Sequence, residues 1–244
     1  MKQTFLATLI LFFLFSGCKP KSKNTDEKNT GADLISQTAN YVKLIGSYVG
    51  DFGTNKITLL ITRAISDTIE GRSIVGGNDR PFAGFVKFAE GKYSISAKEP
   101  GDDKDDGVFN FTIDDQQPDM VTGRWQPNAA GAHLGTKDFS LKRRAFVYLV
   151  DVGQYPQASK QLLTEDEVSN MMKEDLEIMR NEIFARHGYC FKKKKFREVF
   201  EDKDWYIPNT VEVKNELTDI EKKNIALIKR YEKYADENGN DFGR

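Results

Sequence analysis

Ile57-Thr58-Leu59-Leu60-Ile61-Thr62 is the stretch of this 244-residue chain that indicates its fold, because apolar side chains take every second position. A period of two is typical of a β-strand with one face on a core. The same alternation recurs in three later runs, Tyr93–Ala97, Phe109–Ile113 and Val121–Trp125, and clusters of Gly, Asn, Asp and Pro separate them. We therefore predict an antiparallel β domain over residues 41–150, with about eight strands in a barrel or a sandwich.

Glycines inside the predicted strands favour the sharp bends that a small barrel needs at its corners: Gly46, Gly50, Gly71, Gly84 and Gly123. An eight-stranded barrel is just wide enough to be filled by side chains or to hold one small ligand. The general shape resembles lipocalin-like and avidin-like barrels, and this resemblance implies that the β domain could take a small apolar ligand. A barrel filled by its own side chains is the alternative.

The first residues have the pattern of a bacterial lipoprotein signal. Lys2 precedes an apolar run, Phe5–Phe15, that is too short to span a bilayer but has the length of a secretory signal core. The segment Leu14-Phe15-Ser16-Gly17-Cys18 then resembles the lipobox of bacterial lipoproteins, with Phe15 where Leu is more usual. The resemblance implies cleavage of a signal peptide over residues 1–17 and acylation of Cys18, for example with palmitate. An ordinary secretory signal with a chance cysteine is the alternative.

Residues 18–40 are polar and predict a flexible tether between the lipid and the first domain. Several acyl chains on Cys18 would anchor the chain stably in a membrane. Lys19 stands where lipoproteins kept in the inner membrane of some bacteria carry Asp. We therefore expect the outer membrane, with a Gram-positive cell surface as the alternative. The tether lysines, Lys19, Lys21 and Lys23, form either a solvated spacer or a contact with anionic headgroups.

The composition excludes several classes of protein. With 2 Cys and 2 His, a His/Cys zinc site or a Cys-His nucleophile pair is nearly excluded by count, and a net charge of −1 argues against a nucleic-acid partner. The acidic loop Pro100–Gly107 fails as a calcium-binding loop, because Lys104 and Ile113 occupy ligand positions. We interpret it as a charged hairpin loop and His133 as an exposed, inert residue, and we predict no cofactor and no metal.

From residue 151 onward the apolar period changes to that of a helix. We predict a linker over residues 151–161, a helical domain over residues 162–235 and a disordered tail over residues 236–244. Capping boxes at Thr164–Glu167 and Thr218–Glu221 indicate the starts of the first and last helices. One helix is expected to run through Val168, Met172, Leu176, Met179 and Ile183 until Gly188 ends it, and Phe196, Val199 and Phe200 predict a short helix.

The stretch Arg180-Asn181-Glu182-Ile183-Phe184-Ala185-Arg186-His187-Gly188-Tyr189 resembles the signature of the YARHG domain family, with Phe184 in place of the usual Tyr. The resemblance covers Leu162 to Glu232 and continues in order through Phe191, Phe200, Trp205-Tyr206, Leu217-Thr218 and Glu221-Lys222-Lys223-Asn224-Ile225. It implies an extracytoplasmic module of the cell envelope and implies no chemistry. Any role of the Tyr hydroxyl is lost with Phe184.

The candidate binding residues are Arg180, Asn181, Glu182, Arg186, His187, Trp205 and Tyr206. One interpretation is a polar pocket at a helix end that binds an anionic envelope component. The favoured alternative is a network that locks this helix onto the last one, with an arginine paired to a buried carboxylate and Asn224 as its buried partner. Cys190 is interpreted as a small buried residue, and Lys192–Lys195 as a solvated face that could otherwise contact phosphate or carboxylate groups.

These features favour a non-enzymatic, lipid-anchored protein of the cell envelope that binds or scaffolds. Its YARHG module would dock to the cell wall or to an envelope protein, and its membrane contact would be the acylated Cys18. An inhibitor or assembly partner of an envelope protein, reaching a cleft with the loop Pro100–Gly107, is the first alternative. A cell-wall hydrolase ranks below both, because no motif picks out an acid-base pair among the many carboxylates. No catalytic residue is predicted.

Overall fold

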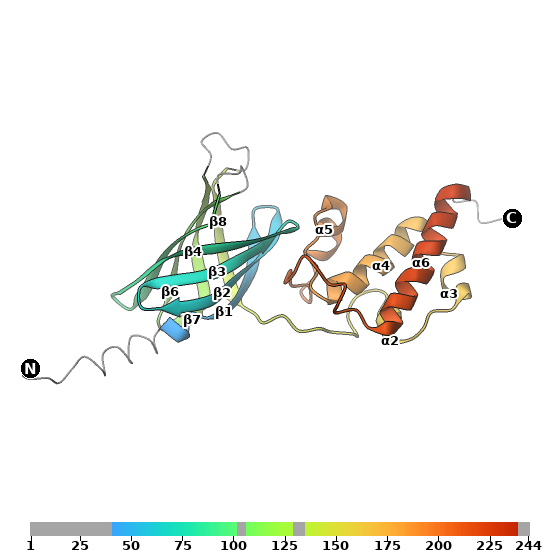
Figure 1. Cartoon of the computed structure of the whole chain (residues 1–244), viewed down its shortest axis with the longest axis horizontal. Coiled ribbons are helices and arrows are strands. Elements are labelled where there is room, and N and C mark those ends of the chain that lie inside the picture. The colour runs from blue at the N-terminus through green and yellow to red at the C-terminus, as the bar shows by residue number, and fades with distance from the viewer. Residues whose placement is uncertain (1–40, 102–105, 129–134, 239–244) are drawn as a thin grey trace, which may run out of the picture.

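The computed structural model of the chain describes residues 41–101, 106–128 and 135–238. Eight antiparallel strands close into a barrel, in which each strand pairs with the next along the chain and β8 pairs with β1 (Figure 1). The strands are β1 (Gly46–Phe52), β2 (Asn55–Ile65), β3 (Thr68–Val75), β4 (Asn78–Ala89), β5 (Lys92–Lys98), β6 (Gly107–Asp114), β7 (Gln117–Pro127) and β8 (Lys137–Arg143). The predicted β domain is therefore confirmed, and it is a closed barrel and not a sandwich.

Side chains from the alternating positions of the strands point into the barrel and form its core. In β5 every second residue is buried, as Tyr93, Ile95 and Ala97 show. Aromatic residues from several strands share this core: Phe52, Phe82, Phe109, Phe111, Trp125 and Phe139. Gly84 lets β4 and β5 approach closely, since a Cβ there would lie 2.0 Å from the Ser96 carbonyl oxygen.

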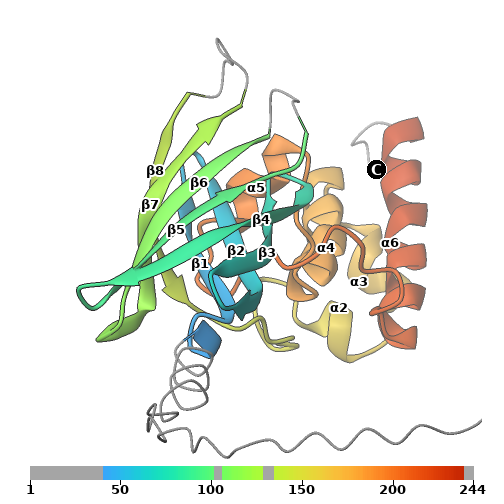
Figure 2. The ribbon, with the colours of Figure 1, turned by 60° about the vertical axis from the view of Figure 1, so that its left-hand side comes forward.

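The second part of the described chain is helical, which confirms the predicted α+β architecture. Its helices are α2 (Gln157–Lys160), α3 (Glu165–Ser169), α4 (Lys173–Arg186), α5 (Lys194–Phe200) and α6 (Asp219–Asn238). Helices α4 and α6 lie side by side, and α2 contacts both (Figure 1, Figure 2). Both predicted capping boxes are present: Glu167 accepts a hydrogen bond from the Thr164 amide at 2.7 Å, and Glu221 accepts one from the Thr218 amide at 2.9 Å.

The prediction of a single helix through Val168 and Leu176 is wrong, because the chain forms two helices there, α3 and α4. Ser169 is the last residue of α3 and Asn170 is its C-cap. Both residue types are weak in helix interiors, since their side chains compete for backbone hydrogen bonds. Met172 is the N-cap of α4 and is 42% exposed, so it does not belong to the buried stripe that the spacing suggested.

The barrel and the helical part touch each other through the β1–β2 and β3–β4 turns. The Gly77 amide between β3 and β4 donates a hydrogen bond to Cys190 Sγ at 3.2 Å. Arg197 of α5 donates from Nε to Asn55 Oδ1 at the start of β2, at 3.0 Å. Helix α5 is accordingly the helix drawn nearest to the barrel in Figure 1. The two parts of the chain therefore share a polar contact through these turns.

Candidate functional site

The last turns of α4 carry the motif residues on two opposite faces. A helix turns by about 100° per residue, so side chains two positions apart point in nearly opposite directions. Glu182 and Arg186 are buried against the helical core, while Arg180 and Phe184 on the other face are only partly buried. The structure therefore divides the predicted site into a buried network and an open groove.

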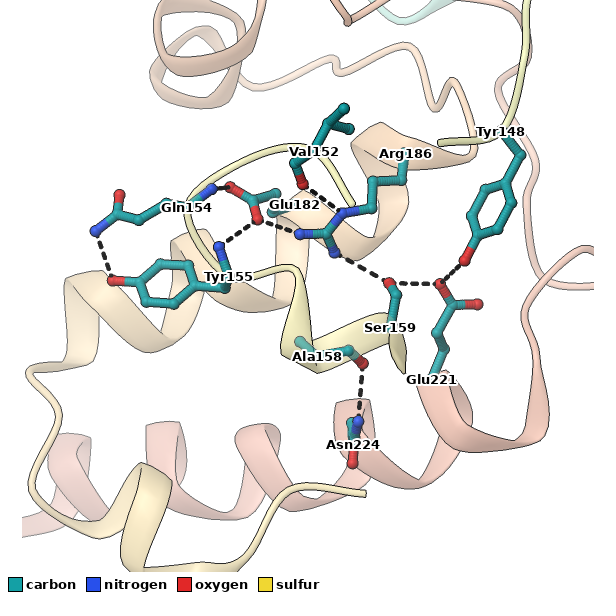
Figure 3. A network of polar contacts seen from close by, with 10 residues as sticks. All are labelled: Tyr148, Val152, Gln154, Tyr155, Ala158, Ser159, Glu182, Arg186, Glu221 and Asn224. Carbon is teal, nitrogen blue, oxygen red and sulfur yellow. Dashed lines mark hydrogen bonds and ion pairs between the residues drawn. The ribbon is translucent and has the colours of Figure 1, made fainter. Parts of the chain in front are cut away.

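The buried network is built around Arg186, which is 1% exposed (Figure 3). Its guanidinium pairs with the Glu182 carboxylate and donates hydrogen bonds to the Val152 carbonyl at 2.9 Å and to Ser159 Oγ at 3.0 Å. Glu182 also accepts hydrogen bonds from the two backbone amides of residues 154–155, each at 2.7 Å. Because both charges are satisfied, this pair fixes α4 to the segment that arrives from the barrel.

A second carboxylate, Glu221 at the start of α6, extends the network to the motif histidine. Glu221 Oε2 lies 2.8 Å from His187 Nε2, and Oε1 accepts hydrogen bonds from Ser159 at 2.7 Å and from Tyr148 at 3.1 Å. Burial alone would raise the pKa of Glu221, but hydrogen bonds from His187, Thr218 and Ser159 outweigh burial and lower the pKa to about 2. Glu221 is therefore a fixed negative charge between α4, α6 and the segment before α2.

These contacts fit the structural interpretation of the motif, but the proposed role of Asn224 is wrong. Asn224 is buried as expected, yet it contacts neither Arg180 nor Arg186. Its Oδ1 accepts a hydrogen bond from the Leu163 amide at 2.9 Å, and its Nδ2 donates to the carbonyls of residues 158 and 161 at 2.8 and 2.7 Å. The side-chain amide of Asn224 therefore attaches the backbone of α2 and of the segment after it to α6.

The opposite face of α4 borders an open groove of about 690 Å³. Its floor is apolar and largely aromatic, with side chains from α4, α5, α6 and the segments between them: Phe184, Tyr189, Phe191, Phe196, Val213, Leu217 and Ile225. Phe184 stands at the position of the motif Tyr and brings no hydroxyl group to this floor. Two of the predicted binding residues, Arg180 and Asn181, line the groove, and Arg180 pairs with Glu232 at 2.7 Å.

The rim of the groove is cationic. Four of its lysines have no ion-pair partner among the described residues: Lys192, Lys193, Lys214 and Lys229. The predicted lysine run is therefore divided, because Lys194 and Lys195 lie outside the groove lining and pair with Glu198 and Glu177. Sequence reasoning missed Lys214 and Lys229, since both lie far from the run in the sequence, and only the packing of α6 and of the segment before it places them at the same groove.

Trp205 and Tyr206 belong to an aromatic cluster around α5 and not to the groove lining. Tyr206 is fully buried, and its hydroxyl donates a hydrogen bond to the Tyr189 carbonyl at 2.8 Å. Cys190 is buried as predicted, and burial raises the pKa of its thiol to about 11. A thiol with this pKa is not a nucleophile at neutral pH, so packing accounts for Cys190.

The barrel leaves a cavity of about 250 Å³ next to α5. Trp125 and Lys137 of the barrel and Arg197 of α5 line it together. Glu99 also lines it and accepts hydrogen bonds from Trp125 Nε1 at 3.1 Å and from the Gly107 amide at 3.0 Å, and burial raises the pKa of this carboxyl. The cavity is charged, so the small apolar ligand expected for the barrel stays a prediction.

Several predicted features lie outside the described residues: the signal peptide, Cys18, the tether, the tip of the acidic loop at residues 102–105, and His133. Within the described ranges, no group of three or more His, Cys, Asp or Glu side chains could hold a metal ion. No helix in the described part of the chain combines the length and the apolar character needed to cross a membrane.

The fold and the site define a protein of two parts, a closed antiparallel barrel and a small helical domain whose motif helix separates a buried network from a groove. The helical part is a YARHG domain, because the model of that family matches residues 154–233. The match confirms the resemblance seen in the sequence and includes α2, which lies in the segment predicted as a linker. It suggests an extracytoplasmic, non-catalytic module of unknown role. Neither the curated proteins nor the solved structures contain a match to the chain.

Proposed function

We propose that the protein is a non-enzymatic, lipid-anchored protein of the cell envelope, and that its YARHG domain binds an envelope component in the groove beside α4. The observation that carries this proposal is the combination of an apolar floor with four rim lysines that have no ion-pair partner in the described ranges. Apolar hollows with polar rims mark interaction sites on soluble proteins, because exposed apolar surface is unfavourable in water.

The motif residues are divided between a buried network and an open groove, and this arrangement supports a binding function over a hydrolytic one. The carboxylates of Glu182 and Glu221 are buried and already accept hydrogen bonds from within the domain. A general acid or base has to reach a substrate proton within about 3 Å, directly or through one water. These two carboxylates therefore stabilise the fold, and the groove lining beside the motif is mostly cationic and apolar, with Glu212 as its one carboxylate.

The docking of the YARHG domain can be tested by co-sedimentation. Residues 31–244, which retain every described residue, are mixed with purified cell wall or washed envelope and pelleted. We expect the chain in the pellet, and we expect Lys192→Glu combined with Lys229→Glu to keep it in the supernatant. The matched control is Lys194→Glu with Lys195→Glu, outside the groove lining. A parent chain that pellets no better than an unrelated protein would contradict the proposal.

The lipid anchor is proposed at Cys18, on the support of the lipobox resemblance, and Lys19 supports the outer membrane. Growth with labelled palmitate should label the wild-type chain and leave Cys18→Ser unlabelled. The variant should also move from the membrane fraction to the soluble fraction, since it has lost its acyl chains. Label that persists in Cys18→Ser would show that this cysteine is not the anchor.

An assembly role for the barrel is the second candidate function, and one surface feature favours it. Phe85 on β4 is 68% exposed and lies in a shallow hollow on the outer face of the barrel. Small polar side chains of the neighbouring strands line the same hollow: Ser94, Ser96, Asn110, Thr112 and Thr122. One large aromatic side chain in a polar surface is the arrangement of an anchor residue at a protein interface.

A pull-down from envelope extract tests this second function. A partner that binds the outer face of the barrel should be lost with Phe85→Ser and retained with Val147→Ser, which removes an apolar side chain that is 59% exposed elsewhere. Equal loss in both variants would mean that the captured protein recognises exposed apolar surface in general. That result would contradict a specific interface at Phe85.

A further inference from the structure

We infer that the groove beside α4 takes a small amphiphilic anion, an acyl chain with a phosphate headgroup, and not an extended peptide. This inference rests on the proposed binding function of the same groove and adds the class of ligand. It is carried by the apolar floor, by the lysines of the rim and by three backbone groups at the edge of the groove that are already hydrogen-bonded.

The apolar floor of the groove indicates that the ligand has an apolar part. Phe184, Tyr189 and Leu217 are only partly buried, and Val211 at the edge is 38% exposed, so the empty groove leaves apolar surface in contact with water. The volume of about 690 Å³ falls in the range of pockets that enclose most of a small ligand. Covering this floor with an acyl chain would remove both surfaces from water, which is the main source of favourable free energy in such binding.

The lysines of the rim indicate that the ligand has a negatively charged headgroup. Lysines converge on the groove from three places: the segment before α5 (Lys192 and Lys193), the segment between α5 and α6 (Lys214), and α6 itself (Lys229). Arg180 is neutralised by Glu232, and the one carboxylate of the lining, Glu212, already accepts a hydrogen bond from the backbone amide of residue 214 at 2.6 Å. Ammonium groups that lack a carboxylate partner suit a phosphate, which has several acceptor oxygens.

The edge of the groove argues against an extended peptide. Peptides that bind as added strands need free backbone N–H and C=O groups on the receiving protein. Here the Glu212 amide donates to Thr210 Oγ1 at 3.1 Å, and the Lys214 amide donates to Glu212 Oε1 at 2.6 Å. The Lys192 carbonyl accepts a hydrogen bond from Arg197. At these three positions the groove therefore has no free backbone group for an added strand, whereas its lysine side chains are exposed to a ligand.

Calorimetry with three probes separates the two parts of the ligand. Residues 31–244 are titrated with dodecyl phosphate, with dodecyl maltoside and with inorganic phosphate, each below the concentration at which micelles form. We expect dodecyl phosphate to bind at least about ten-fold more tightly than either of the others. It alone has both an alkyl chain for the apolar floor and a phosphate for the rim lysines. Equal affinity for the maltoside, equal affinity for inorganic phosphate, or no binding of dodecyl phosphate would each overturn the inference.

Variants locate the binding in the groove. Lys192→Gln with Lys229→Gln should weaken dodecyl phosphate by about ten-fold or more and leave the maltoside unchanged. The pair Lys194→Gln and Lys195→Gln should change neither affinity, since both side chains lie outside the groove lining. In the unaltered chain, dodecyl phosphate should protect the four rim lysines from acetylation more than Lys194 and Lys195. Equal protection of all six lysines would overturn the inference.

Failure of this inference is distinguishable from failure of the proposed docking function. If the groove variants abolish co-sedimentation with envelope while dodecyl phosphate does not bind, the docking function stands and the ligand class is wrong. If dodecyl phosphate binds with the expected pattern while the chain does not pellet, the groove ligand stands and the docking function is wrong. Binding to anionic vesicles without binding to monomeric dodecyl phosphate would show adsorption to a surface and would overturn the inference.

Discussion

Glu221 is a buried carboxylate whose contribution to stability depends on pH. Its pKa is lowered from the ordinary value of 4.5 to about 2 in the folded chain. A group with a depressed pKa stabilises the fold above its unfolded pKa, and that contribution is lost as the pH falls through the window between the two values. We expect the free energy of unfolding to fall by about 3 kcal/mol from Glu221 alone between about pH 5 and pH 2, as measured by urea unfolding.

The variant Glu221→Gln should lose this part of the pH dependence and should be destabilised by about 3 kcal/mol at pH 7, because donors from His187 and Ser159 then face an uncharged group. Glu167→Gln is the matched control, since Glu167 has the same capping role on α3 in an exposed position. Urea unfolding of both variants measures the difference. An equal loss of stability in the two would show that capping, and not the buried network, is what Glu221 contributes.

The capping role of Glu221 could be predicted from the sequence, and the network around it could not. Thr218 lies three residues before Glu221, so the hydrogen bonds of the capping box depend on local spacing alone. His187 and Ser159 lie 34 and 62 residues away, and they reach Glu221 only because α2, α4 and α6 pack in one particular way. A pattern of residue types contains no information on that packing register.

Gly188 follows the C-cap of the motif helix α4 and has a backbone conformation that favours glycine. Its φ is +73°, and a Cβ there would lie 2.8 Å from the Phe146 ring and 2.8 Å from Asn209 Cβ. Gly188→Ala should therefore destabilise the chain by about 1–3 kcal/mol, as measured by thermal unfolding. Gly91→Ala is the matched control, because Gly91 has a φ of +75° with open space around it. Equal losses would contradict the packing part of the prediction.

At the scale of single helices, the two faces of α4 could be predicted from the sequence. Arg180 and Phe184 are four residues apart, as are Glu182 and Arg186, and the helical period places the two pairs on opposite sides. The break before α4 was less accessible, because the spacing of Val168 and Leu176 also fits one continuous helix. The preference of Asn170 for a helix end is a weak signal, and an apolar repeat of three and four overrode it.

For the whole molecule, the sequence predicted strands but not their closure. Alternation along a strand shows which side chains face a core, and it is the same in a sandwich and in a barrel. Closure depends on the pairing of Tyr48 with Arg143 and of Val49 with Lys142, between the first strand and the last. The contact between the barrel and the YARHG domain could not be predicted either. No feature of the sequence indicates that the Gly77 amide and Cys190 Sγ are hydrogen-bonded.

That contact contains a carboxyl group that changes its charge near neutral pH. Glu201 at the end of α5 is partly buried against the Lys56 backbone, and burial raises its pKa to about 7 even though Lys56 and Arg197 lower it. Lys56 Nζ also donates hydrogen bonds to the carbonyls of Lys203 at 2.9 Å and Tyr206 at 3.4 Å. We therefore expect the domain contact to be most favourable while Glu201 is protonated.

The sign of the resulting pH dependence follows from the raised pKa. A carboxyl that titrates near 7 in the contact and near 4.5 in water binds a proton on docking, so docking weakens as the pH rises from about 4.5 to about 7. The loss should be about 1–3 kcal/mol.

Fluorescence energy transfer between labels at Thr112→Cys and Lys222→Cys, both exposed positions, should report separation of the two parts between pH 5 and pH 8. Glu201→Gln should remove this response, and Glu198→Gln on the exposed side of α5 should keep it. The same response in all three chains would show that another group controls the contact.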